Sequence, residues 1–137
     1  MSLRFNAIMD KQEVNQMNPL QLAYLGDAVW EMIVRYDLII KKFNVRHMHK
    51  KCVQLVNAHS QAEVLHTVEQ FLLPEETEIV RRGRNAHPKH TVPRNQSPED
   101  YAAATGFEAL FGYLYLTGNN ARIEQMINII KEVFFNG

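Results

Sequence analysis

The stretch Leu22-Ala23-Tyr24-Leu25-Gly26-Asp27-Ala28-Val29 is an apolar run with one glycine and one carboxylate at its centre. It follows Asn18-Pro19, a helix cap with proline at the first helical position, which predicts a helix from Pro19 to about Lys42. At 100° per residue, one side of this helix is apolar: Leu22, Leu25, Val29, Met32, Ile33, Tyr36 and Ile40.

The side of this helix that carries Asp27 is apolar as well. It also holds Leu20, Trp30, Val34 and Leu38. A helix that is apolar nearly all round is typical of a buried position. Asp27 is therefore expected inside or at the edge of packed structure, where an unpaired charge is costly and needs a positive partner. A metal ion is the working hypothesis for that partner.

Capping and turn residues divide the rest of the chain into further helices. The predicted helices run from Pro19 to about Lys42, from Val45 to Asn57, from the capping-box pattern Ser60-Gln61-Ala62-Glu63 to about Gln70, from Pro74 to a loop at 85–96, from Ser97 to about Leu116, and from Asn119 or Asn120 to Phe135. Alternating strand patterns are missing from the sequence, so the predicted fold class is all-α.

The composition is that of a single globular domain. The chain has 137 residues, of which 46% are hydrophobic and 22% charged, and its formal net charge is zero. Cys52 is the only cysteine, which excludes a disulfide framework within the chain and favours a reducing, intracellular setting. The sequence contains no signal-peptide pattern and no uninterrupted apolar run long enough for a membrane span, so a cytoplasmic protein is expected.

A second isolated carboxylate lies in the long predicted helix after Ser97. Glu108 is the only charged residue between Asp100 and Arg122. If the two apolar helices cross, Asp27 and Glu108 can meet, and such hard oxygen ligands suit Mg²⁺ or Mn²⁺. The alternative is that each acid pairs with an arginine or caps a neighbouring helix.

Glu31 lies one turn after Asp27 on the same helix. Two acids at this spacing repel each other weakly, and Arg35, one further turn on, is expected to neutralise Glu31. A contact of Glu31 to the metal through water is the other possibility.

Basic residues gather in two parts of the chain despite its neutral total. Residues 81–94 contain five Lys or Arg and no acid, which suits contacts to nucleic-acid phosphates; a solvated charge run is the alternative. The candidate RNA-binding residues are Arg81, Arg82, Arg84, Asn85, Lys89 and Arg94. Residues 35–51 contain six Lys or Arg against one acid and are expected to form a wet helix face.

Two motifs resemble the ribonuclease III family. The stretch at 22–29 is similar to that family's Leu-Glu-Phe-Leu-Gly-Asp motif, and Thr105-Gly106-Phe107-Glu108-Ala109-Leu110-Phe111-Gly112 resembles its Asp-x-x-Glu-Ala-Leu motif. Ala23 and Thr105 stand where the family has two further metal-site acids. No double-stranded-RNA-binding domain follows in the sequence. This combination resembles Mini-III, the short bacterial branch of the family.

The resemblance implies an all-α bundle of about six or seven helices, with residues 18–137 as the catalytic domain and 1–17 packed on it or leading into it. It implies a Mg²⁺-dependent endoribonuclease, with Mn²⁺ as a possible substitute, that cleaves double-stranded RNA to 5′-phosphate products and matures the ends of 23S ribosomal RNA. Asp27 and Glu108 are then the catalytic and metal-binding residues.

The same resemblance implies a homodimer with Tyr24 at its interface, and it makes Glu31 and Thr105 candidates for supporting contacts around the metal. The two missing acids leave a second function open. In that alternative the chain is a degenerate ribonuclease-III-like fold that binds structured ribosomal RNA without cutting it.

Overall fold

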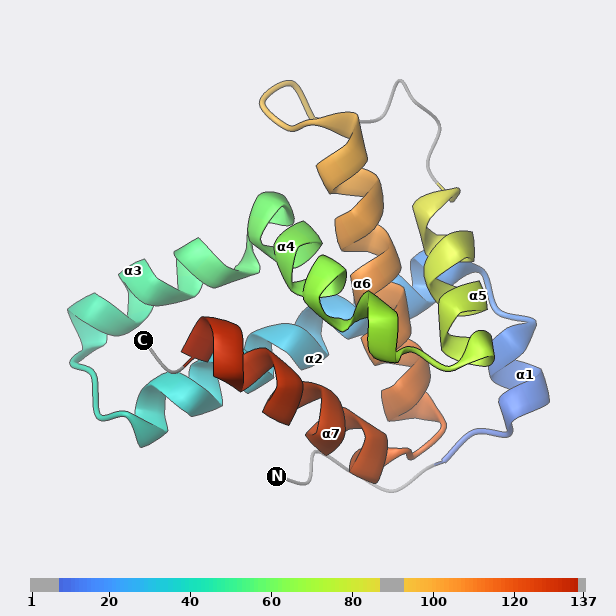
Figure 1. The fold of residues 1–137 in the computed structure, drawn as a ribbon, viewed down its shortest axis with the longest axis horizontal. Helices are drawn as coiled ribbons and strands as arrows, with labels where there is room; N and C mark the ends of the chain where they lie inside the picture. Colours follow the sequence, from blue (N-terminus) through green and yellow to red (C-terminus); the bar gives the residue numbers. More distant parts are fainter. Residues whose placement is uncertain (1–7, 87–92, 136–137) are drawn as a thin grey trace.

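The computed structural model describes residues 8–86 and 93–135, and every regular element in these ranges is helical (Figure 1). The α-helices are α1 (Lys11–Asn15), α2 (Pro19–Ile40), α3 (Val45–Val56), α4 (Ala58–Val68), α5 (Pro74–Arg84), α6 (Pro98–Leu116) and α7 (Asn120–Ile130). A 3₁₀ turn (Glu69–Phe71) follows α4, and a π-helical turn (Lys131–Phe135) continues α7. The prediction of an all-α fold is confirmed. Among the described residues, no helix has the length and hydropathy needed to cross a bilayer.

Most helices begin where the sequence predicts. The side-chain oxygens of Asn18, Asn44, Ser97 and Asn119 each accept a hydrogen bond from a backbone N–H in the first turn of the following helix. Pro74 is the first residue of α5. These starts depend on local chemistry, because a cap satisfies N–H groups only two or three residues away.

The predicted start of α4 at Ser60 is wrong. The helix begins at Ala58, and the side-chain oxygen of Asn57 accepts a hydrogen bond from the Ser60 N–H at 2.9 Å. The side-chain amide of Asn57 also donates to the carbonyls of Val53 and Gln54, both at 3.1 Å. One asparagine therefore ends α3 and begins α4, which leaves no room for a separate capping box.

α1 is a short helix that the sequence pattern does not predict, because five residues are too few to show an apolar period. Its Val14 is fully buried. The guanidinium of Arg82, on α5, donates to the carbonyls of Asn15 at 2.8 Å and Met17 at 2.9 Å. These bonds fasten the segment between α1 and α2 to α5.

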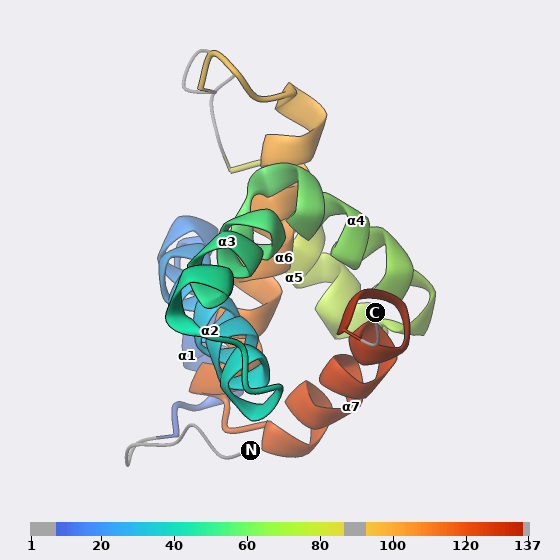
Figure 2. The same ribbon diagram turned by 90° about the vertical axis from the view of Figure 1, so that its left-hand side faces the viewer.

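α6 occupies the middle of the molecule and packs against α2, α4 and α5 (Figures 1 and 2). Its crossing with α2 is made by two glycines. A Cβ atom added to Gly26 would lie 1.6 Å from the carbonyl oxygen of Glu108, and one added to Gly112 would lie 2.0 Å from the carbonyl oxygen of Leu22. The two backbones touch directly, so any side chain at either glycine would force the helices apart.

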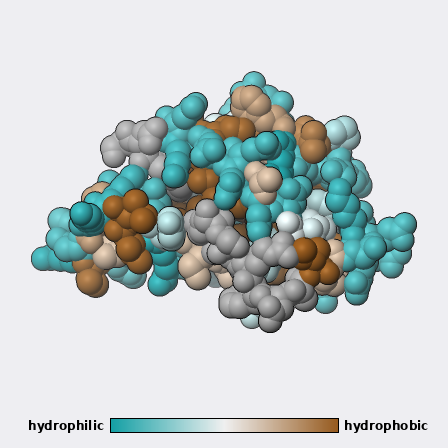
Figure 3. Space-filling view, turned by 90° about the horizontal axis from the view of Figure 1, so that it is seen from below, coloured by the Kyte–Doolittle hydropathy of each residue, from teal (hydrophilic) through white to brown (hydrophobic). Residues whose placement is uncertain are grey.

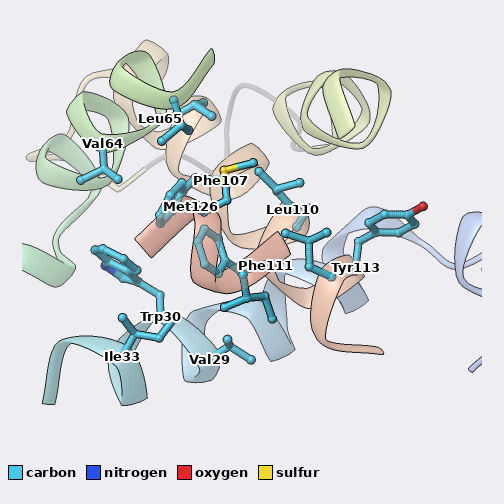
Figure 4. Packing of buried hydrophobic residues seen from close by; sticks show 14 of the residues in the cluster. Val29, Trp30, Ile33, Val64, Leu65, Phe107, Leu110, Phe111, Tyr113 and Met126 are labelled. Atoms are coloured by element: carbon cyan, nitrogen blue, oxygen red, sulfur yellow. The ribbon is translucent and has the colours of Figure 1, made fainter. Parts of the chain in front are cut away.

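The core around this crossing is aromatic (Figure 4). The ring of Phe107 lies edge-on to that of Trp30 with 5.0 Å between centroids, and Phe111 lies 4.9 Å from Phe107. The indole N–H of Trp30 donates to the carbonyl of Leu55 at 3.2 Å, which satisfies its one polar group. Trp30, on α2, thereby joins the end of α3 to α6.

The predicted faces of α2 need correction. Trp30, Val34 and Leu38, which were predicted to lie beside Asp27, are buried in the core. Met32, Tyr36 and Ile40, which were predicted on the apolar side, are exposed. A helix that is apolar all round does not indicate which face is buried. Here the close approach at Gly26 sets the rotation of α2.

Candidate functional site

Asp27 and Glu108 meet where α2 crosses α6. Asp27 directly follows Gly26, and Gly26 packs directly against the backbone of Glu108. The helix contact therefore brings the backbones of the two acidic residues together, and the prediction that the acids meet if the helices cross is confirmed. Glu108 is half-buried and hydrogen-bonded to Asp27.

The two acids differ in their exposure. Of the two expected positions for Asp27, inside or at the edge of packed structure, the structure shows the edge: Asp27 is exposed beside the buried Gly26, and Glu108 is the more enclosed of the pair. Burial raises the pKa of Glu108 to about 8, and the hydrogen bond and negative charge of Asp27 act in the same direction. At neutral pH the Glu108 carboxyl therefore keeps its proton when no cation is bound.

This pair fits a divalent cation. Asp27 lies close enough to Glu108 to raise its pKa, so a single cation placed between them can stabilise both carboxylates as anions. The residues described by the structure contain no group of three or more His, Cys, Asp or Glu side chains that could hold a metal ion. Protein would therefore supply two ligands to Mg²⁺ or Mn²⁺, and water would complete the shell, as is common for Mg²⁺.

The positions one helical turn before each of the two acids are buried. Ala23, one turn before Asp27, is buried, as is Thr105, one turn before Glu108. The Thr105 hydroxyl donates to the carbonyl of Tyr101 at 3.0 Å within its own helix. Neither position offers a further carboxylate to a cation.

Glu31 has the partner that its spacing predicts. A guanidinium nitrogen of Arg35 lies 3.2 Å from a carboxylate oxygen of Glu31, and this prediction is confirmed. Because both side chains are largely exposed, the ion pair contributes little to stability.

Gln61 is a part of the site that sequence reasoning missed. Its side chain is 2% exposed, and its amide nitrogen donates to the Oε2 atom of Glu108 at a distance of 3.4 Å. The row Gln61, Val64, Leu65 and Val68 follows the helical period, and all four are buried. A polar residue in an apolar row was the available signal, but the capping-box interpretation of residues 60–63 concealed it.

The predicted basic segment has acidic partners that lie outside residues 81–94. Arg81 donates to Glu78 at 2.9 Å, and Arg84 pairs with Glu69 in the 3₁₀ turn. Arg82 donates to backbone carbonyls near α1. The interpretation that no acid balances the charge of this segment is therefore wrong. Glu78, one turn earlier in α5, pairs with Arg81, and Glu69, in the 3₁₀ turn, pairs with Arg84.

Two of the three remaining candidate residues of this segment, Asn85 and Arg94, are exposed. Asn85 follows the last residue of α5, and Arg94 lies in the turn before α6. In Figures 1 and 2 this turn stands away from the other helices. The first turn of α6 behind it is bonded to α4, where Nδ1 of His59 lies 2.9 Å from Oδ2 of Asp100. Lys89 lies outside the described residues.

Tyr24 is the most exposed of the large apolar residues on α2, with 85% of its surface accessible. Ala28, Met32 and Tyr36 follow it at four-residue spacing, and all are exposed. Figure 3, a view from below, shows apolar side chains in separate places on a mostly hydrophilic surface. The row of Tyr24, Ala28, Met32 and Tyr36 is the exposed apolar strip of α2, a helix whose other face is in the core.

Known proteins resemble this chain in sequence and in fold. Residues 20–119 match the model of the Ribonuclease III domain. The chain is 40% identical to a Mini-ribonuclease 3 of Clostridium tetani, over 90% of this chain and 83% of that protein. It is 44% identical to a Mini-ribonuclease 3 of Brevibacillus brevis, over 87% of this chain and 92% of that protein. A crystal structure of a Fusobacterium nucleatum protein superposes with a TM-score of 0.78 at 30% identity, covering 88% of this chain and 96% of the other.

Proposed function

Since this chain belongs to the ribonuclease III family, among the Mini-ribonuclease 3 proteins, and is therefore an endoribonuclease, we propose that its substrate is double-stranded RNA and its cofactor Mg²⁺. We further propose that it matures the ends of 23S ribosomal RNA in the cytoplasm. The observation that carries the proposal is the meeting of Asp27 and Glu108 at the crossing of α2 and α6. Mn²⁺, with similar oxygen preference, can replace Mg²⁺ in this role.

In this proposal Asp27 and Glu108 hold the divalent ion. A bound ion supplies Lewis-acid polarisation of the scissile phosphate and activation of the attacking water. Asp27, which is exposed, faces the side from which RNA can approach, and Glu108 supports it from the interior. The buried Ala23 and Thr105 keep the number of protein ligands low, which leaves coordination positions for water and phosphate oxygens.

Cleavage of an RNA stem tests the proposal directly. The wild-type protein is expected to cut a duplex made from the paired ends of a 23S ribosomal RNA precursor in the presence of Mg²⁺, to leave 5′-phosphate ends, and to stop on addition of EDTA. Asp27→Asn is expected to bind the same duplex without cutting it. Binding without cleavage by the wild type, at every concentration of Mg²⁺ or Mn²⁺, would instead support the RNA-binding scaffold.

Arg81 and Arg84 in the last turn of α5, and Arg94 in the turn before α6, are proposed to contact RNA phosphates. The triple variant Arg81→Gln, Arg84→Gln, Arg94→Gln is expected to weaken duplex binding. It should also lower the slope of log affinity against log salt by about one for each phosphate that the variant no longer neutralises. Arg82 stays unchanged because it holds the chain near α1.

The control is a second triple variant, Arg46→Gln, Lys50→Gln, Lys51→Gln, which removes the same charge from exposed positions on α3. Its salt slope is expected to match that of the wild type. Equal slopes for all three proteins would exclude residues 81–94 from the RNA site.

A homodimer is proposed to form through the apolar strip on α2. Two antiparallel RNA strands require two active sites related by a two-fold axis, and a strip that begins at the exposed Tyr24 is suited to pack against its own copy. Sedimentation is expected to show a dimer for the wild type and a monomer for Tyr24→Glu at micromolar concentration. Ile8→Glu, an exposed apolar residue outside α2, is the control and should remain dimeric. A monomeric wild type would contradict the two-fold arrangement.

A further inference from the structure

Gln61 is a buried amide whose bond crosses from one helix to another. It sits on the core-facing row of α4, its side chain is 2% exposed, and its amide nitrogen lies 3.4 Å from Oε2 of Glu108 on α6. Buried polar groups are costly unless hydrogen-bonded, and an apolar residue would suit the other positions of this row. The hydrogen bond to Glu108 therefore offsets the cost of burying the Gln61 amide.

Three helices contribute to the carboxylate pair through this contact. Asp27 comes from α2, Glu108 from α6 and Gln61 from α4, which packs against α6. The first two positions are set by the glycine crossing. The Glu108 side chain has several rotatable bonds beyond its backbone, so the crossing alone does not orient its carboxylate.

An amide is chemically suited to orient that carboxylate. An ionised carboxylate can only accept hydrogen bonds, and the Gln61 amide N–H₂ group is a donor that brings no charge. A donor on Oε2 restricts rotation of the carboxylate and leaves lone pairs free for a cation. Groups that hold a metal ligand in this way commonly change metal affinity when they are replaced.

We propose that Gln61 is a positioning residue, which holds the Glu108 carboxylate in the orientation that binds the divalent ion. The inference rests on the proposed metal-dependent function. The orientation of Glu108 matters more because the site has few acids. Ala23 and Thr105 are buried and uncharged, so Asp27 and Glu108 are the two carboxylates that must be oriented to bind the ion.

Metal binding by the intact protein without RNA is the test, with Mn²⁺ as the probe followed by electron paramagnetic resonance. Gln61→Met keeps the length and burial of the side chain and removes the amide. It is expected to raise the half-saturating Mn²⁺ concentration by about tenfold. In cleavage assays the half-saturating Mg²⁺ concentration should rise by a similar factor, with a smaller change in kcat at saturating Mg²⁺.

Val64→Ala is the matched control, because Val64 is fully buried one turn along the same row of α4. It is expected to lower stability while leaving Mn²⁺ affinity as in the wild type. The inference is overturned if Gln61→Met binds Mn²⁺ as the wild type does, or if Val64→Ala loses affinity equally. A wild type that binds no divalent ion would overturn the metal-dependent function itself, which is a separate result.

A second measurement needs no substitution. In the wild type, the side-chain N–H₂ resonances of Gln61 are expected to shift when Mg²⁺ is added, because the group to which they donate becomes a metal ligand. The side-chain amide of Asn57, which donates to carbonyls at the junction of α3 and α4, is the internal reference and should not move. Unchanged Gln61 resonances at saturating Mg²⁺ would contradict the proposal.

Discussion

Glu108→Gln is expected to abolish RNA cleavage and, in the absence of metal, to make the protein more stable at pH 8. Cleavage should fall by more than about 100-fold, because replacing even the groups around a metal ligand often lowers activity 10- to 100-fold. The gain in stability arises because the wild-type carboxyl lies in a place where its charged form is disfavoured.

The direction of the pH dependence follows from the pKa of Glu108. This pKa is raised from 4.5 to about 8 in the folded protein, so the folded state keeps a proton that the unfolded state has released. The free energy of unfolding therefore decreases as the pH rises from about 4.5 to 8, and the full loss is present above pH 8. Because Glu108 is only half-buried, the loss is roughly 2 kcal/mol rather than the full value of the shift.

Urea unfolding of the metal-free proteins at pH 5 and pH 8 measures this effect. The wild type should lose stability between the two values, and Glu108→Gln should lose less. Addition of Mg²⁺ at pH 8 should stabilise the wild type but not Glu108→Gln. Glu31→Gln, which removes one exposed acid paired with Arg35, is the control and should retain both cleavage and the wild-type pH dependence. Cleavage by Glu108→Gln at the wild-type rate would remove this residue from the metal site.

Gly26→Ala is expected to destabilise the protein strongly by the addition of one methyl group. The new Cβ would lie 1.6 Å from the carbonyl oxygen of Glu108 and 2.9 Å from the backbone nitrogen of Gly112. Both are backbone atoms of α6, so no side-chain rotation can relieve the overlap and the helices must separate. The expected loss is about 4 kcal/mol or more, a large part of the stability of an ordinary domain.

A graded series of glycine substitutions separates this cause from a general preference for glycine. The expected order of destabilisation is Gly26→Ala, then Gly112→Ala, then Gly83→Ala, whose nearest backbone contacts would lie at 1.6, 2.0 and 2.7 Å. Gly118→Ala, at a positive φ of 70° beyond the end of α6, should cost only about 1 kcal/mol. Urea midpoints give the order, and a Gly26→Ala protein as stable as Gly118→Ala would contradict direct backbone contact.

The sequence predicted those parts of the fold and site that depend on neighbours along the chain. Caps such as Asn18 and Ser97 act within one turn, and the pairing of Glu31 with Arg35 is a matter of helical spacing. The meeting of Asp27 and Glu108 could be predicted only on the condition that the two apolar helices cross, and the family resemblance supported that condition.

Other parts depend on how the helices are placed in space and could not be predicted in this way. Gln61 reaches Glu108 only because α4 packs on α6, and Arg84 finds Glu69 only because the 3₁₀ turn lies beside the end of α5. The exposure of Asp27 depends on the rotation of α2, which an all-round apolar pattern leaves open.

The glycine crossing also bears on how the site opens and closes. Asp27 and Glu108 are carried by the two helices whose backbones touch, and these helices form the centre of the core. Fluctuations that separate the acids therefore have to disrupt the most tightly packed part of the protein. Amide protons of residues 22–34 and 104–112 are accordingly expected to exchange with solvent only through global unfolding, so that heat inactivation and loss of structure occur together.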